Sequence, residues 1–152
     1  MEFMKAIGLA HNCVAEFDKI SQKFEFRGGD ADEVCLVNFC EQVGFTVAET
    51  KQGLTTLELR DRSKLKFDVF RKIEFTSERK RMSILVRDPT DDKIKLYIKG
   101  ADNVVLSRLS TIQSDSIVAK TKKFVDCASM HGLRTLMVAM KEITEGELDV
   151  FL

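Results

Sequence analysis

Alternating apolar and polar residues dominate the middle of the chain and predict antiparallel strands. Between residues 65 and 86 the apolar positions recur every second residue, with charged residues between many of them. These apolar positions are Leu65, Phe67, Val69, Ile73, Phe75, Met82, Ile84 and Val86. A polar turn at residues 88–92 leads into a further strand. There we expect Ile94, Leu96 and Ile98 to face the core and Lys95, Tyr97 and Lys99 to form the polar face.

Helical and turn signals flank this central region. Helices are predicted at residues 2–15, 31–43, 101–109, 114–131 and from about Glu145 onward. Asp30 is a candidate N-cap, and Glu33 three residues later predicts a capping box. A short strand is expected at 24–26, a hairpin at 45–50 and 54–60, and a last strand at 133–141. The pattern predicts a single α+β domain over 1–152, a mainly antiparallel twisted sheet flanked by helices.

Composition indicates a soluble globular chain. Hydrophobic residues make up 44% and charged residues 32% of the sequence, and 24 Lys and Arg balance 24 Asp and Glu. This balance argues against a dedicated nucleic-acid binder, which carries a positive field. No window approaches the roughly 18 apolar residues of a membrane span, and the start lacks the features of a signal peptide. We therefore expect a cytosolic character.

Four cysteines, Cys13, Cys35, Cys40 and Cys127, raise the question of disulfides or zinc. No C-x-x-C pair is present, and five residues along a helix separate Cys35 from Cys40 by about 140°. The two histidines are also far apart in sequence. Buried, reduced thiols and no metal site are the expectation.

Three segments carry candidate chemistry. Phe75 stands four residues ahead of the cations Arg79-Lys80-Arg81, Lys99-Gly100 stands where a strand passes into a helix, and Arg134 interrupts an apolar run. Each has an ordinary structural explanation: a core aromatic, a solvated strand end, a sheet-edge arginine. Helix N-terminal amides after Gly100 would favour an anion. The G-x-x-x-x-G-K-[ST] phosphate loop is absent.

Taken together and in order, these segments resemble a known family. FTSERKRMSILV, KGADNVV and GLRTLMVAM look like the nucleotide-binding domain of P-type ATPases, and their pairing is similar to the type IV, phospholipid-transporting branch. Ala10-His11-Asn12-Cys13 and the Asp30–Glu33 helix start resemble its N-terminal half, although Asp30-Ala31 replace the usual Ser-Pro. The resemblance covers nearly the whole chain.

The resemblance implies a role for each matching residue. Phe75 would stack on adenine, Glu33 would approach the adenine edge, and Lys99 would lie deep beside the base. Lys80 would lie toward the phosphates, and Arg134 would reach the sugar or phosphate end. The remaining expected lining residues are Ser77, Met82 and Gly100, and Arg79 and Arg81 are expected to face solvent.

The resemblance also implies what lies outside the chain. The family transfers phosphate to an aspartate in a D-K-T-G-T motif, and this sequence contains neither that motif nor a T-G-E loop. No catalytic residue is therefore predicted here. ATP is the expected ligand, with Mg²⁺ held mainly elsewhere in the pump. The expected partners are the phosphorylation and actuator domains and an accessory subunit, at the cytoplasmic face of a membrane; the chain itself is expected to be monomeric.

Two other functional classes compete with this interpretation. A polyanion-binding module would use the Arg79-Lys80-Arg81 patch with Arg71, Lys72 and Arg87. It predicts steep salt dependence of RNA or heparin binding. A thiol enzyme would pair Cys127 or Cys13 with His131 or His11, and predicts a fast-reacting thiolate.

Overall fold

The computed structural model describes residues 1–20 and 22–152 and folds them into five helices and eight strands. In chain order these are α1 (Glu2–Leu9), β1 (Val14–Asp18), β2 (Lys23–Arg27), α2 (Ala31–Gln42), β3 (Phe45–Lys51), β4 (Leu54–Leu59), β5 (Lys64–Ile73), β6 (Arg81–Asp88), β7 (Lys93–Gly100), α3 (Asp102–Leu106), α4 (Asp115–Met130), β8 (Met137–Ile143) and α5 (Glu145–Phe151).

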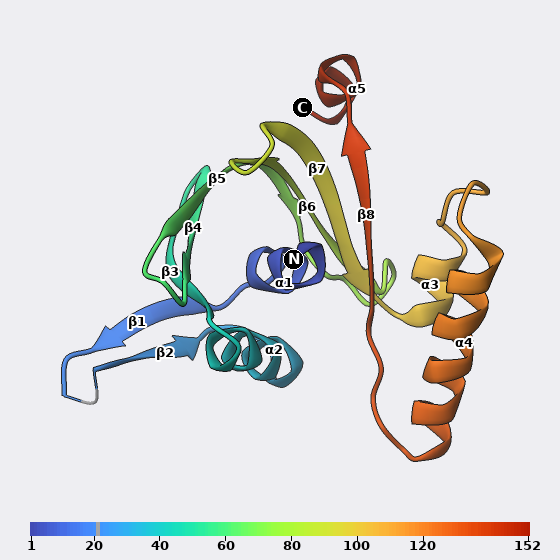
Figure 1. Ribbon diagram of the computed structural model, residues 1–152, viewed down its shortest axis with the longest axis horizontal. Helices are drawn as coiled ribbons and strands as arrows, with labels where there is room; N and C mark the ends of the chain where they lie inside the picture. Colours follow the sequence, from blue (N-terminus) through green and yellow to red (C-terminus); the bar gives the residue numbers. More distant parts are fainter. Residues whose placement is uncertain (21) are drawn as a thin grey trace.

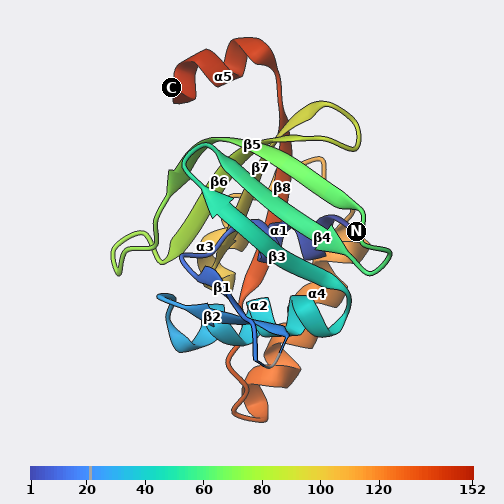
Figure 2. The same cartoon turned by 90° about the vertical axis from the view of Figure 1, so that its left-hand side faces the viewer.

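Six of the strands form one antiparallel sheet in the order β3-β4-β5-β6-β7-β8, and β1 pairs with β2 in a separate hairpin. The sheet curves around α1, which contacts β3 near one edge and β7 and β8 near the other (Figure 1). Helices α3 and α4 lie on the other side of the sheet (Figure 1). Figure 2 shows the β1–β2 hairpin below β3, beside α2. This arrangement confirms the predicted α+β class.

Both faces of the sheet are covered. The face toward α1 and α2 carries the larger core, which includes Val37 of α2, Leu57 of β4, Phe67 of β5 and Ile84 of β6. On the opposite face, one cluster joins Leu85 to α5 through Leu148, and another joins Val105 of α3 to α4. The central strands therefore bury residues of both alternation phases, as expected for a sheet between two layers.

The prediction for β7 named the wrong face as polar. Lys95, Tyr97 and Lys99 are the deeply buried row, 3%, 0% and 6% exposed, and they face α1 and α2. The apolar row does face a core as predicted: Ile94 is 3% exposed, and the partly buried Leu96 and Ile98 pack against the clusters on the other face. The alternation was predicted correctly, but the long polar side chains point toward acidic partners on the α1 and α2 side rather than toward solvent.

A buried ionic network fastens α1 to the β6–β7 turn. The Lys5 ammonium donates to Asp88 Oδ2 at 2.6 Å and Lys95 donates to the same oxygen at 2.8 Å. Thr90 donates to the other carboxylate oxygen at 2.7 Å. The Tyr97 hydroxyl donates to Glu2 at 2.6 Å, so two residues of α1 are tied to β7 and its turn.

Three boundaries differ from the sequence prediction. The first helix ends at Leu9 rather than residue 15, because Asn12 N donates to Glu33 and Cys13 N donates to His11 Nδ1 instead of continuing the helical ladder. Val14 onward pairs as β1, a strand the alternation did not predict. The last strand starts at Met137 and not at residue 133. The other predicted elements are present within a few residues.

An irregularity in β5 explains why its predicted alternation fails near the end. The register with β6 shifts between Val69 and Arg71, as at a β-bulge. Phe70 consequently packs with the α5-side cluster. The strand ends at Ile73, so Phe75 lies beyond it.

Among the described residues, no helix is long and apolar enough to cross a membrane.

Gly100 is required by the close approach of two backbones. It stands opposite Arg81 in the β6–β7 ladder, and a Cβ on Gly100 would lie 2.5 Å from the Lys80 carbonyl oxygen. The same carbonyl accepts a hydrogen bond from Ala101 N at 3.0 Å, which fixes the turn into α3.

Gly100→Ala should therefore lower the free energy of unfolding by about 1–3 kcal/mol, because the added methyl group would clash with the Lys80–Arg81 backbone, which is held in the sheet. Urea denaturation measures this. Gly146→Ala is the matched control, since a Cβ added there would meet no atom within 4 Å and alanine favours α5. Equal effects of the two substitutions would contradict this account of Gly100.

Asp88→Asn should cost up to about 3–5 kcal/mol of unfolding free energy, because it removes the fully buried carboxylate that Lys5 and Lys95 share and leaves them only the partly exposed Glu2 and Asp91. Asp92→Asn in the same turn removes an acid whose side chain is 88% exposed and should cost far less. Thermal and urea unfolding of both variants provide the comparison.

The same network makes the stability of the fold depend on pH in the acid range. Burial acts to raise the pKa of Asp88, but hydrogen bonds from Lys5, Lys95 and Thr90 outweigh it and hold the pKa below its ordinary value of 3.8. A carboxyl with a depressed folded pKa stabilises above its unfolded pKa and loses that contribution as the pH falls. Wild-type stability should fall below about pH 4, and Asp88→Asn should flatten this dependence; a parallel fall in both proteins would count against it.

Candidate functional site

Six of the eight predicted binding residues line one small cavity of about 80 Å³: Glu33, Phe75, Met82, Lys99, Gly100 and Arg134. Asp30, Asp32 and Leu136 complete its wall. The residues come from the start of α2, the segment after β5, the adjoining ends of β6 and β7, and the segment before β8. The fold thus gathers side chains that are up to about a hundred positions apart in the sequence.

The innermost feature of the cavity is a buried ion pair. Lys99 Nζ lies 3.3 Å from Glu33 Oε1, and the two side chains are 6% and 9% exposed. The other carboxylate oxygen of Glu33 accepts from the Asn12 backbone at 3.1 Å. Within the described chain, Glu33 is the one hydrogen-bond acceptor found for the Lys99 ammonium, which has three N–H groups. Lys99 therefore retains donor capacity beside the cavity.

The predicted capping box at α2 forms only in half. Asp30 accepts from Glu33 N at 2.8 Å, as an N-cap should. The Glu33 side chain does not return to the Asp30 backbone, because it is used by Asn12 and Lys99. The first turn of α2 therefore places Glu33 across the gap to β7.

Met82 and Gly100 form the sheet side of the cavity. Met82 stands directly opposite Lys99 in the β6–β7 ladder, so the two side chains share a face. Met82 is 1% exposed and belongs to the core. Gly100 has no room for a side chain because the Lys80–Arg81 backbone fills that space, which is a different reason from the ligand approach suggested by the sequence.

Phe75 forms an open wall of the cavity. Its side chain is 52% exposed, although its alternation phase matched the core residues of β5. The register shift in β5 and the end of that strand at Ile73 release Phe75 from the core. Phe75 therefore presents an accessible aromatic side chain beside the cavity.

Arg134 lies in the segment before β8 and not inside a strand, contrary to the prediction. Its side chain is 80% exposed, and Nε lies 3.0 Å from Asp32 Oδ2. The arginine therefore needs no buried anion to balance it, and it lies at the solvent-exposed edge of the cavity.

Ser77 and Lys80 do not line the cavity; both are exposed in the turn before β6. The prediction that Arg79 faces solvent is wrong, because its guanidinium donates to the Glu74 carbonyl at 2.6 Å and so holds the turn together. Arg81 is half-buried and donates to the Arg79 carbonyl at 2.9 Å. In the described structure no hydrogen bond or ion pair involves the Lys80 ammonium, which is thus the accessible cation of the run.

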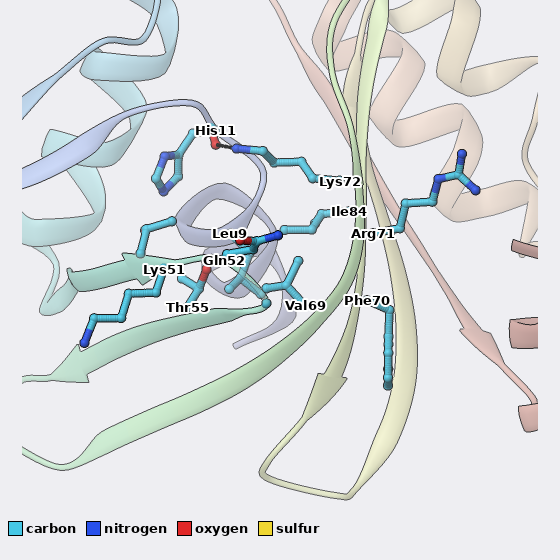
Figure 3. A pocket seen from close by; sticks show the side chains of 12 residues that line it. Leu9, His11, Lys51, Gln52, Thr55, Val69, Phe70, Arg71, Lys72 and Ile84 are labelled. Atoms are coloured by element: carbon cyan, nitrogen blue, oxygen red, sulfur yellow. Dashed lines mark hydrogen bonds between the residues drawn. The ribbon is translucent and has the colours of Figure 1, made fainter. Parts of the chain in front are cut away.

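A larger cavity of about 430 Å³ lies between the β3–β4 hairpin, β5 and the loop after α1, and none of the eight residues predicted to bind nucleotide lines it (Figure 3). His11 and Lys72 border it, and Lys72 donates to the His11 carbonyl at 3.2 Å. Arg71 and Phe70 point away from the other lining residues in Figure 3. The smaller cavity is the better candidate site, because a buried ammonium, a carboxylate and an open aromatic ring converge there.

The geometry does not support an activated thiol. Burial, followed by the charge of Glu33, raises the pKa of Cys13. Burial lowers the pKa of His11 to about 4, so the ring stays neutral, and its two nitrogens bond Gly8 O and Cys13 N. His131 bonds the carbonyl of Cys127 and not its sulfur. Only Cys13 and Cys40 are buried, so the expectation of four buried thiols was half wrong.

The basic residues do not form a free polyanion patch. Arg71 donates to the Phe151 carbonyl, Arg87 lies 2.9 Å from Glu145, and Lys72 and Arg79 bond backbone carbonyls. A polyanion would have to displace these contacts to reach the guanidinium groups. This arrangement disfavours the nucleic-acid alternative.

Asp32 was missing from the predicted site. The prediction gave roles to Asp30 and Glu33 and none to the acid between them. Two consecutive acids in the first turn of a helix were the available signal, since acidic residues there are favoured by the positive end of the helix dipole. Among the described residues, no three His, Cys, Asp or Glu side chains group in a way that could hold a metal ion.

Comparison with known proteins agrees with the fold. The sequence model of the family described as "P-type ATPase, cytoplasmic domain N" matches residues 1–150. A phospholipid-transporting ATPase of Schizosaccharomyces pombe is 39% identical over 146 residues, which is 96% of this chain and 10% of that protein.

Two further relatives extend the pattern across fungi and animals. Phospholipid-transporting ATPase DNF1 of Chaetomium thermophilum is 37% identical over 95% of this chain and 9% of its own length. Phospholipid-transporting ATPase IC of Xenopus tropicalis is 34% identical over 97% of this chain and 11% of its own length. The chain thus spans about a tenth of these relatives. It belongs to the family of cytoplasmic N domains of P-type ATPases.

Proposed function

We propose that this chain binds ATP at the cavity beside Lys99 and serves as the nucleotide-holding domain of a phospholipid-transporting pump. The observation that carries the proposal is the buried Lys99 ammonium, paired with Glu33 at 3.3 Å next to the half-exposed ring of Phe75. A base edge carries both hydrogen-bond donors and acceptors. A carboxylate and an ammonium side by side can satisfy both kinds, and an aromatic ring can stack on the base.

In this proposal each residue contacts a different part of ATP. Phe75 stacks on adenine, Glu33 accepts from the base edge and Lys99 donates to it, while Met82 supplies an apolar floor. Arg134, at the exposed edge, meets the sugar or phosphates. Lys80 and Ser77 lie outside the cavity, so they would contact only the phosphate end that projects into solvent.

The size of the cavity argues for weak binding. A volume of about 80 Å³ is well below the roughly 300–1,000 Å³ of typical ligand pockets, so much of the nucleotide would remain outside. Base stacking contributes about 1–3 kcal/mol, and exposed lysine–phosphate contacts add little at physiological salt. A net of about −4 to −5 kcal/mol corresponds to a dissociation constant of roughly a millimolar to a few hundred micromolar.

The chain should bind ATP without hydrolysing it. Phosphoryl transfer in this family needs an aspartate nucleophile in a D-K-T-G-T motif, and the sequence has none. From its family, Mg²⁺ would accompany the nucleotide and be ligated mainly in another domain of the pump. We propose that the whole pump presents ATP to that aspartate at the cytoplasmic face of a membrane, with the phosphorylation and actuator domains and an accessory subunit as partners.

The transported substrate is proposed from the relatives alone. The curated relatives described above are named as phospholipid-transporting ATPases, so we infer that the parent protein moves phospholipids.

Phe75→Ala should weaken ATP binding about 5- to 150-fold, the range that corresponds to a loss of roughly 1–3 kcal/mol of stacking. An NMR titration of the chain with ATP measures the dissociation constant in the millimolar range. Phe124→Ala is the matched control, because Phe124 is 73% exposed on α4 and does not line the cavity. An affinity unchanged by Phe75→Ala would show that the ring is not the stacking surface.

A further inference from the structure

Arg134 is the cation that a phosphate chain would need, and it is already paired with Asp32. Arg134 Nε lies 3.0 Å from Asp32 Oδ2, and the two side chains are 80% and 32% exposed, Arg134 being the more exposed. Both line the cavity, and they join the start of α2 to the segment before β8. The pair is far more exposed than Lys99, whose side chain is 6% exposed.

Acidic groups outnumber basic groups in the wall of the cavity. Its carboxylates are Asp30, Asp32 and Glu33, and its cations are Lys99 and Arg134, which gives a formal charge of 2 − 3 = −1. Each cation already has an acidic partner in the described structure. The wall by itself therefore offers a polyphosphate little net attraction.

The two partners of the outer pair are held differently. Asp32 stands in the first turn of α2, whose N-cap Asp30 accepts from Glu33 N and so fixes the turn. Arg134 stands outside regular secondary structure and carries a long, mostly exposed side chain. When the pair separates, Arg134 is the group that turns toward a new anion, and Asp32 stays behind.

We propose that Asp32 weakens the binding of the phosphate groups of the nucleotide, because it competes with them for Arg134. This proposal rests on the proposed ATP-binding function and adds a residue that this function does not need. Binding of ATP exchanges one carboxylate partner of Arg134 for phosphate oxygens. The phosphates therefore add less to the binding affinity than they would if Arg134 were unpaired. The affinity contributed by the adenosine group is unaffected.

The competition makes the nucleotide easy to release. A domain that holds ATP for transfer at another site benefits from a phosphate end that is loosely bound. Exchange between two anions at one exposed guanidinium costs little, because neither state leaves the charge buried and unpaired.

The test compares ATP with adenosine at one fixed ionic strength. Asp32→Asn should tighten ATP binding about two- to fivefold, the range expected from freeing one exposed ion pair, and should leave adenosine binding unchanged. An NMR titration with each ligand gives both dissociation constants. ATP affinity that is unchanged or weaker in Asp32→Asn overturns the proposal.

A double-mutant cycle separates competition from simple charge repulsion. In the Arg134→Ala background, Asp32→Asn should no longer tighten ATP binding, because the contested cation is gone. If the same gain persists without Arg134, Asp32 acts through its charge alone and the proposal is wrong. If the wild-type chain binds neither ATP nor adenosine, the proposed function itself fails and this inference with it.

Asp92→Asn is the matched control. It removes the same charge from the β6–β7 turn, at the opposite end of the strands from Gly100, and should leave ATP binding unchanged. Thermal unfolding of Asp32→Asn and Asp92→Asn should stay close to the wild type, which shows that the affinities compare folded proteins. An equal gain in ATP affinity from Asp92→Asn would assign the effect to net charge and overturn the role of Asp32.

Discussion

The burial of three polar side chains on β7 is the constraint on which the rest of the structure depends. Lys95, Tyr97 and Lys99 point into the layer formed by α1 and α2, where an unpaired charge would cost several kcal/mol. Each is satisfied by an acid from a different segment: Asp88 for Lys95, Glu2 for Tyr97 and Glu33 for Lys99. These partners locate both N-terminal helices on the sheet, so the same interactions that stabilise the fold also build the site.

The candidate site lies at the end of this row of buried polar side chains on β7. Lys99 completes the pairing on the α2 side, and immediately beyond it Gly100 lets the β6 and β7 backbones close together. The register shift in β5 leaves Phe75 outside the core at the same edge. The cavity therefore combines a buried, charged interior with an open aromatic wall and an exposed outer cation, which suits a ligand that is held briefly by its base.

Much of this arrangement could be predicted from the sequence, and the failures have physical causes. Turn residues and alternation gave the β3–β4 hairpin and the central strands, because these signals are local. The buried face of β7 was assigned wrongly, since burial of Lys95 and Lys99 depends on acids 7 and 66 residues away. The ion pair of Asp32 was missed because its arginine is about a hundred residues away, and the exposure of Phe75 was missed because it follows from a register shift in β5.

The central claim is that one small pocket, centred on the Lys99–Glu33 pair, receives the base. Mapping backbone amide chemical shifts of the isotope-labelled chain during an ATP titration tests it most directly. The account predicts that Glu33, Phe75, Lys99 and Arg134 respond together with one dissociation constant, while Thr50 and Gln52 beside the larger cavity stay unchanged. Shifts concentrated at Thr50 and Gln52, with Lys99 and Glu33 silent, would contradict it.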